Sequence, residues 1–161
     1  MKAATIHEIK QELTNVPASQ LIELCLRLAR FKKENKELLT YLLFEAFDES
    51  AYIVLVKEEI DENFDLLNLA NLYFIKKGLR KIVRTITKYI RYTGSKQVEV
   101  ELLLYFCSKL KDSDIPIRES ALINNLYESQ LKKIHKVLET MHEDLQYEYI
   151  KELEKLGRSS H

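Results

Sequence analysis

The fold is indicated most clearly by residues 75–91, which read Ile75-Lys76-Lys77-Gly78-Leu79-Arg80-Lys81-Ile82-Val83-Arg84-Thr85-Ile86-Thr87-Lys88-Tyr89-Ile90-Arg91. Apolar residues recur in this stretch at spacings of three and four, the period of an α-helix that buries one face. The expected buried face carries Ile75, Leu79, Ile82, Ile86 and Ile90. The pattern therefore predicts a long amphipathic helix that packs against other helices.

The opposite side of this predicted helix carries positive charges alone. Eight basic residues and no acidic one lie between Lys76 and Lys96. At 100° per residue, six of them fall within an arc of about 100°: Lys77, Arg80, Lys81, Arg84, Lys88 and Arg91. Like charges four residues apart repel by a few tenths of a kcal/mol, so we expect a partner to offset the repulsion. We predict a partner-binding face made of these six residues, with Tyr73 and Tyr92 beside them as groups that could stack on a base or a guanidinium.

Three kinds of partner fit this cationic face. Residues 34–65 hold ten acidic side chains against only Lys36 and Lys57, so the first is the acidic segment of the same fold or of a second copy. The second is an acidic protein partner, and the third is nucleic acid or anionic lipid. We expect a protein partner or self-association, with nucleic acid as the alternative and no membrane partner.

Composition extends the helical prediction to the whole chain. The 161 residues include three Gly and two Pro, too few for the many tight turns of a sandwich or barrel. We expect an all-α single domain over residues 1–157, with about seven or eight helices in a short array or irregular bundle. The expected helices cover residues 3–14, a segment opening at Pro17, a segment around 38–48, and residues 50–62, 65–92, 96–111 and 117–156. Residues 158–161 are expected to form a disordered tail.

The last predicted segment, residues 117–156, has neither Gly nor Pro. Its apolar residues from Tyr127 to Leu145 alternate at spacings of four and three, which indicates a heptad seam. This seam would suit a homodimer. A capping box at Thr140-Met141-His142-Glu143 indicates two helices as the alternative to one long rod.

Two observations favour a helical repeat. Shifting the chain by 64 residues aligns Glu37-Leu38-Leu39 with Glu101-Leu102-Leu103, and Tyr41 with Tyr105, although any two amphipathic helices share such periodicity. In addition, the run Asp114-Ile115-Pro116-Ile117-Arg118-Glu119-Ser120-Ala121-Leu122 resembles the opening of the second helix in a HEAT-like repeat. This resemblance covers about fifteen residues, and the first half of the chain lacks the matching Arg after Ser50. It implies a solenoid that binds a partner and catalyses no reaction.

Motifs for catalysis are missing from the sequence. It contains no Gly-x-x-x-x-Gly-Lys-Ser/Thr, Gly-x-Gly-x-x-Gly, His-Glu-x-x-His or Gly-x-Ser-x-Gly segment, so we expect no enzymatic activity and no cofactor. His135, Glu139 and His142 have spacings that would place them on one side of a helix, but a di-iron bundle needs a second such set and further carboxylates. We therefore expect no metal site.

Charge and hydropathy favour a cytoplasmic protein. The 25 basic and 25 acidic residues balance, unlike the excess of positive charge that is typical of dedicated nucleic-acid binders. The longest apolar runs fall well short of the roughly 20 residues of a membrane-spanning helix, and the first residues lack the apolar run of a signal peptide. Cys25 and Cys107 each lie among apolar residues, which suggests reduced, buried thiols.

Overall fold

The computed structural model describes residues 1–158 and belongs to the all-α class in that range, with eight α-helices, one π-helical turn and no strand. This confirms the predicted fold class. The helices pack into two compact units, which we call unit one (Met1–Glu45) and unit two (from Ala46 onward). The single domain expected over residues 1–157 stays a prediction. No described helix combines the length and the apolar composition that crossing a membrane requires.

Unit one is built from three short helices and a turn: α1 (Ile6–Thr14), α2 (Ala18–Phe31), α3 (Lys33–Thr40) and the π-helical turn η1 (Tyr41–Glu45). Thr5 begins α1 with a capping box that it shares with Glu8, which satisfies two backbone donors that the helix leaves unpaired. Pro17 is the N-cap of α2, one residue before the helical position that its sequence suggested. None of the residues of unit one is buried.

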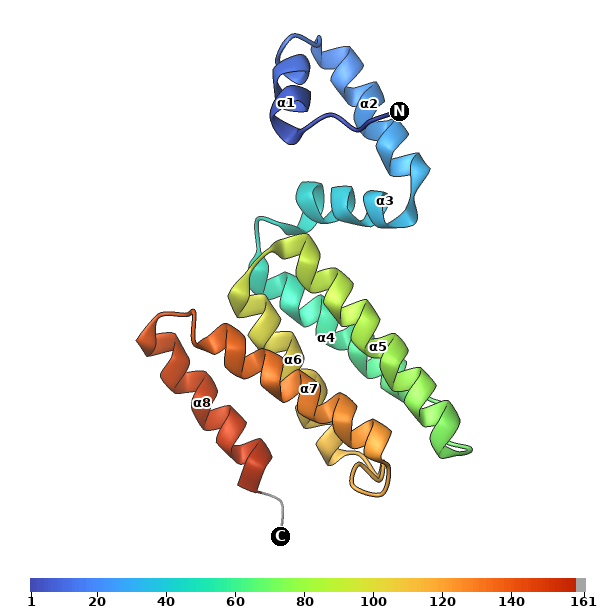
Figure 1. Ribbon diagram of the computed structural model, residues 1–161, viewed down its shortest axis with the longest axis vertical. Helices are drawn as coiled ribbons and strands as arrows, with labels where there is room; N and C mark the ends of the chain where they lie inside the picture. The colour runs from blue at the N-terminus through green and yellow to red at the C-terminus, as the bar shows by residue number, and fades with distance from the viewer. Residues whose placement is uncertain (159–161) are drawn as a thin grey trace. The chain divides into compact units, whose positions relative to one another are not determined.

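Unit two contains five helices: α4 (Glu49–Asp65), α5 (Leu72–Thr93), α6 (Lys96–Asp112), α7 (Ala121–Leu138) and α8 (Glu143–Arg158). The central helix is α6, which packs against each of the other four (Figure 1). A helix that is apolar around its whole circumference is expected to be surrounded. Its buried side chains are Val98, Val100, Leu102, Leu103, Leu104, Phe106, Cys107 and Leu110.

The helix predicted over residues 65–92 begins seven residues later in the structure, at Leu72. Helix α4 continues to Asp65, a loop follows, and α5 begins at Leu72, where Asn71 accepts a hydrogen bond from the amide of Phe74. The prediction missed Asn71 as an N-cap. Gly78 lies inside α5 without breaking it, and a Cβ at this position would overlap Leu67 Cδ2. Gly78 therefore marks a close approach between the loop and the helix.

The segment 117–156 forms two helices, α7 and α8, joined by a turn. Tyr127, Ile134 and Leu138 of the predicted seam are buried in the core of unit two. The proposed homodimer seam is therefore largely internal, and it ends where α7 ends. Helix α8 includes Arg158, so the expected tail begins no earlier than residue 159, and residues 159–161 lie outside the described part of the chain.

Candidate binding surfaces

Helix α5 separates its apolar and basic residues as the sequence predicts. The side chains of Ile75, Leu79, Ile82, Ile86 and Ile90 are buried, with exposed fractions from 0 to 9%. This apolar face packs against α4, α6 and α7. Because the basic residues lie on the other side of the same helix, burial of the isoleucines directs the charges away from the core.

The predicted basic row is largely accessible. Lys77, Arg80, Lys81, Arg84 and Arg91 are exposed, and in the described chain none of them forms an ion pair with a carboxylate. The sixth member, Lys88, is half-buried, with its ammonium 5.3 Å from the ring centre of Tyr89. At 1.5 Å per residue, the row from Lys77 to Arg91 is about 21 Å long. We call these six residues the cationic face.

Three of the six acidic residues of α4 (Glu49, Glu59 and Asp61) accept bonds from other elements. Asp61 Oδ1 lies 2.8 Å from Lys109 Nζ and accepts a 2.7 Å hydrogen bond from the hydroxyl of Tyr105. Burial raises the pKa of the Asp61 carboxyl, but the bonds from Lys109 and Tyr105 outweigh it, and the net pKa is lowered.

Two further carboxylates of α4 accept bonds close to the cationic face from groups other than its five exposed cations. Glu59 accepts a 3.0 Å bond from the hydroxyl of Tyr89, and Glu49 accepts a 3.1 Å bond from Ser95 Oγ. The five exposed cations are therefore not neutralised by the acidic helix of their own unit. This argues against the first predicted partner in its intramolecular form, in which the acidic segment of the same fold pairs with the cationic face.

The two predicted tyrosines differ in access. Tyr73 at the start of α5 is 61% exposed, with Phe74 against its edge at 5.4 Å and Lys76 Nζ 5.8 Å from its ring centre. Tyr92 is half-buried and lies 6.0 Å from the ring of Tyr89. Only Tyr73 of this pair presents a largely open ring.

At the other end of the cationic face, a hollow of about 530 Å³ lies beside the junction of α5 and α6. Arg91 and Lys133 line it together with Glu99. Burial raises the pKa of the Glu99 carboxyl, and Lys133 partly opposes this shift. Lys133 from α7 thus adds a cation near the last arginine of the row, which sequence spacing could not reveal because the two residues are 42 positions apart.

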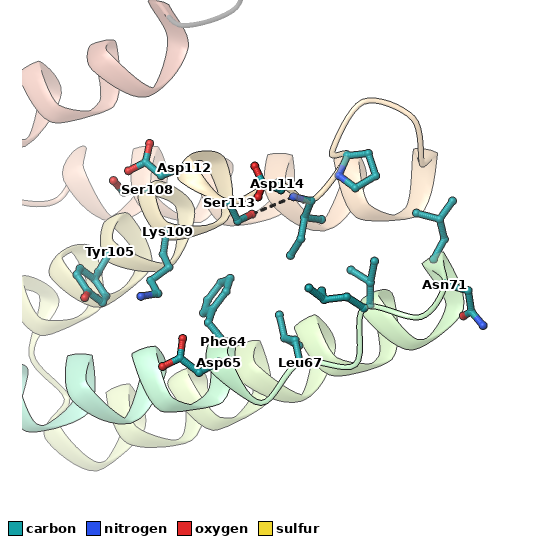
Figure 2. Close-up of a pocket in the computed structure, with 15 residues that line it drawn as sticks. Phe64, Asp65, Leu67, Asn71, Tyr105, Ser108, Lys109, Asp112, Ser113 and Asp114 are labelled. Atoms are coloured by element: carbon teal, nitrogen blue, oxygen red, sulfur yellow. Dashed lines mark hydrogen bonds between the residues drawn. The ribbon is translucent and has the colours of Figure 1, made fainter.

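A larger cavity of about 750 Å³ lies where the loop after α4 meets the loop after α6 (Figure 2). Its apolar lining includes Phe64, Leu67, Ile75 and Ile115, and a polar group contains Ser108 and Ser113. Three exposed carboxylates also line it: Asp65, Asp112 and Asp114. The sequence did not reveal this cavity, because nothing in it indicates that the two loops converge.

This cavity has the size of a small-molecule site, and its carboxylates favour a ligand with an apolar body and a positive charge. Its one lysine, Lys109, is held by Asp61, with Nζ 5.9 Å from the ring centre of Phe64. The arrangement suits binding.

The histidine and cysteine candidates are separated. Helix α7 ends at Leu138, so Glu139 and His142 lie in the turn after it, and His135, Glu139 and His142 do not share one helix. No cluster of three or more metal-ligating side chains occurs in residues 1–158. Cys107 is buried, as expected, but Cys25 is exposed on α2.

Comparisons of this chain with protein-family models, with curated proteins and with solved structures found no match. The function is therefore argued from the surfaces alone.

Proposed function

We propose that this chain is a non-enzymatic interaction module that holds an acidic protein surface against the cationic face of α5. The observation that carries the proposal is the exposed row Lys77, Arg80, Lys81, Arg84 and Arg91, which has no ion pair in the described chain. An unneutralised row of like charges costs stability, and an acidic partner would remove that cost.

The position of the row supports a docking role. Its helix is anchored by five buried aliphatic side chains, so the backbone under the charges is held rigidly before a partner arrives. A rigid, charged surface raises the rate of association and selects partners of opposite charge. The HEAT-like array belongs to the same proposal, because stacked helices of that kind expose extended surfaces for partners.

Nucleic acid is the second candidate for the same face. The observation that favours it is Tyr73, whose ring is 61% exposed near the start of the row. Such a ring can stack on a base while the cations contact phosphates. The balanced charge of the whole chain makes this candidate second, because nucleic-acid binders usually carry a basic excess.

The test compares two charge-reversal variants with the same change in net charge. Lys81→Glu with Arg84→Glu alters the cationic face, and Lys132→Glu with Lys136→Glu alters exposed lysines on α7. Fluorescence anisotropy with labelled poly-glutamate is expected to show at least roughly tenfold weaker binding for the first variant and little change for the second.

Labelled single-stranded RNA and double-stranded DNA serve as the competing probes, at about 50 and 150 mM salt. Tighter binding of either nucleic acid than of poly-glutamate at the higher salt would replace the lead proposal with the second candidate. No binding of any probe at the lower salt, or equal losses in both variants, would refute a binding role for this face.

A further inference from the structure

Unit one has an apolar surface that its own helices leave uncovered. Twelve of its large apolar side chains, from Ile6 to Phe44, are between 36 and 81% exposed, and none of its residues is buried. A unit of this size rarely buries enough apolar surface to be stable alone, and such units commonly depend on oligomerisation. We therefore expect another surface to pack against the exposed apolar side chains of unit one.

Helix α2 shows where the cover is missing. At 100° per residue, its apolar side chains span an arc of about 220°. Within unit one it packs mainly against α3, which can cover only part of this arc. Leu28 is 61% exposed and Phe31 is 80% exposed. A helix that is apolar over most of its circumference belongs inside a bundle.

The α2–α3 hairpin presents two hollows of different chemistry. The first, about 170 Å³, is lined by apolar side chains that include Cys25, Leu28, Leu38 and Leu42, and its one polar residue is Asn35. The Asn35 amide already donates to the carbonyl of Leu28 at 2.8 Å. No charged residue lines this hollow.

The second hollow, about 670 Å³, has an apolar floor that includes Leu43 and Phe44. Four cations lie around it: Arg30, Lys32, Lys33 and Lys36. Two copies facing each other across this hollow would bring eight cations together, which is unfavourable. The uncharged hollow has no such penalty, so it is the side suited to an identical partner.

We propose that unit one self-associates through the uncharged hollow, so that the α2–α3 hairpins of two copies form a four-helix bundle. Two such hairpins packed together place four helices around one shared core, and a twofold axis lets one surface pair with itself. Leu28 and Leu42 line this hollow and are 61% and 57% exposed, so pairing two copies here would remove apolar surface of both from water.

The net charge of unit one is compatible with a second copy of unit one as the partner. Residues 1–45 contain seven Lys or Arg and six Glu, so two copies of unit one carry little net charge toward each other. An apolar interface with few charged residues is typical of homodimers, and no charged residue lines the smaller hollow.

The experiment measures the mass of the full chain by light scattering between about 1 and 100 µM, together with the alkylation rate of Cys25. We expect the mass to approach twice 19.0 kDa as concentration rises. Because Cys25 lines the hollow, its alkylation should slow by about tenfold over the same range.

Two variants locate the interface. Leu28→Glu with Leu42→Glu places charges in the uncharged hollow and should leave the chain monomeric, with Cys107 still protected as the sign that unit two is folded. Leu43→Glu with Phe44→Glu changes the other side of the hairpin and should remain dimeric. Val54→Glu with Leu55→Glu changes exposed apolar residues of α4 in unit two and should also remain dimeric.

Three outcomes would overturn the proposal. A monomer at about 100 µM would show that a second copy does not cover the hollow. A dimer in which the Cys25 rate does not change would place the interface elsewhere. Dissociation by Leu43→Glu with Phe44→Glu alone would assign the interface to the basic hollow.

Discussion

Unit one and unit two are both helical and both rich in leucine and isoleucine, but only unit two has a core. In unit two, four helices surround α6, and the side chains of Phe106, Leu102 and Ile134 are fully buried. In unit one, α2 packs mainly against α3, and none of its residues is buried. The comparison shows that apolar composition by itself does not make a core, since burial also needs enough neighbours to enclose the apolar surface.

The largest expected effect contrasts the same substitution in the two units. Phe106 in α6 is 0% exposed, with its ring 5.7 Å from that of Phe64. Phe106→Ala should lower the free energy of unfolding by about 3–5 kcal/mol, because it removes buried area and leaves a cavity. Phe44→Ala in unit one, where the side chain is 63% exposed, should change it by less than about 0.5 kcal/mol. Urea unfolding followed by circular dichroism gives both values, and equal losses would contradict the contrast.

The two cysteines report the same difference chemically. Burial raises the pKa of the Cys107 thiol to about 12, and the reactive species is the thiolate. Cys25 is exposed. At pH 8 and low protein concentration, Cys25 should be alkylated at least about 100-fold faster than Cys107. Mass spectrometry of tryptic peptides measures both rates, with urea-unfolded protein as the control in which the rates converge. Rapid labelling of Cys107 in the folded chain would be inconsistent with the core of unit two.

Alkaline pH should weaken unit two specifically. Burial raises the pKa of Tyr127 from 10.0 to about 12, with Cys107 and Glu128 adding to the shift, and that of Cys107 from 9.0 to about 12. Between these values the folded state binds more protons than the unfolded state, so the free energy of unfolding must fall as pH rises from about 9 to 12. Urea midpoints at pH 8, 10 and 11 measure this fall. Tyr127→Phe removes one of the groups and should give a shallower pH dependence, so an unchanged slope would argue against the assignment.

The smallest effect concerns one polar group in the core. Gln130 of α7 is 2% exposed, and its Oε1 has no hydrogen-bond partner, whereas its amide donates to the carbonyl of Leu126 at 3.3 Å. Gln130→Leu removes the unsatisfied acceptor and should raise the free energy of unfolding by about 1 kcal/mol. The matched variant Gln20→Leu on exposed α2 should have an effect within about 0.5 kcal/mol. Thermal melts compare the two, and destabilisation by Gln130→Leu would indicate a partner for Oε1.

Local sequence signals predicted several elements correctly. The isoleucine row of α5 follows from residue spacing. The boundary between α4 and α5 was misplaced, because Phe64, Leu66 and Leu67 continue the helical spacing. Only the cap at Asn71 marks the new start, and asparagine also occurs inside helices.

The candidate surfaces were predictable in part. The cationic face was visible because its residues repeat with the helical period, which is a local property. The cavity between the loops at Phe64–Leu72 and Ser113–Pro116 was not visible, since it depends on two segments more than 40 residues apart in the chain. The predicted heptad seam from Tyr127 to Leu145 failed for the same reason: an apolar stripe on one helix is the same whether it faces α6 or a second molecule.

The sequence by itself determined that this chain is helical, where several helices begin and end, and that six of the seven basic residues of α5 lie within one arc of the helix. These properties follow from interactions between residues three or four positions apart, which spacing records directly. Only the tertiary structure decided that α6 is central, that Glu49, Glu59 and Asp61 of α4 are engaged without neutralising the five exposed cations of the cationic face, and that the helices of unit one leave its own apolar side chains exposed. Burial and charge pairing depend on which distant segments meet, and a single sequence does not record those contacts.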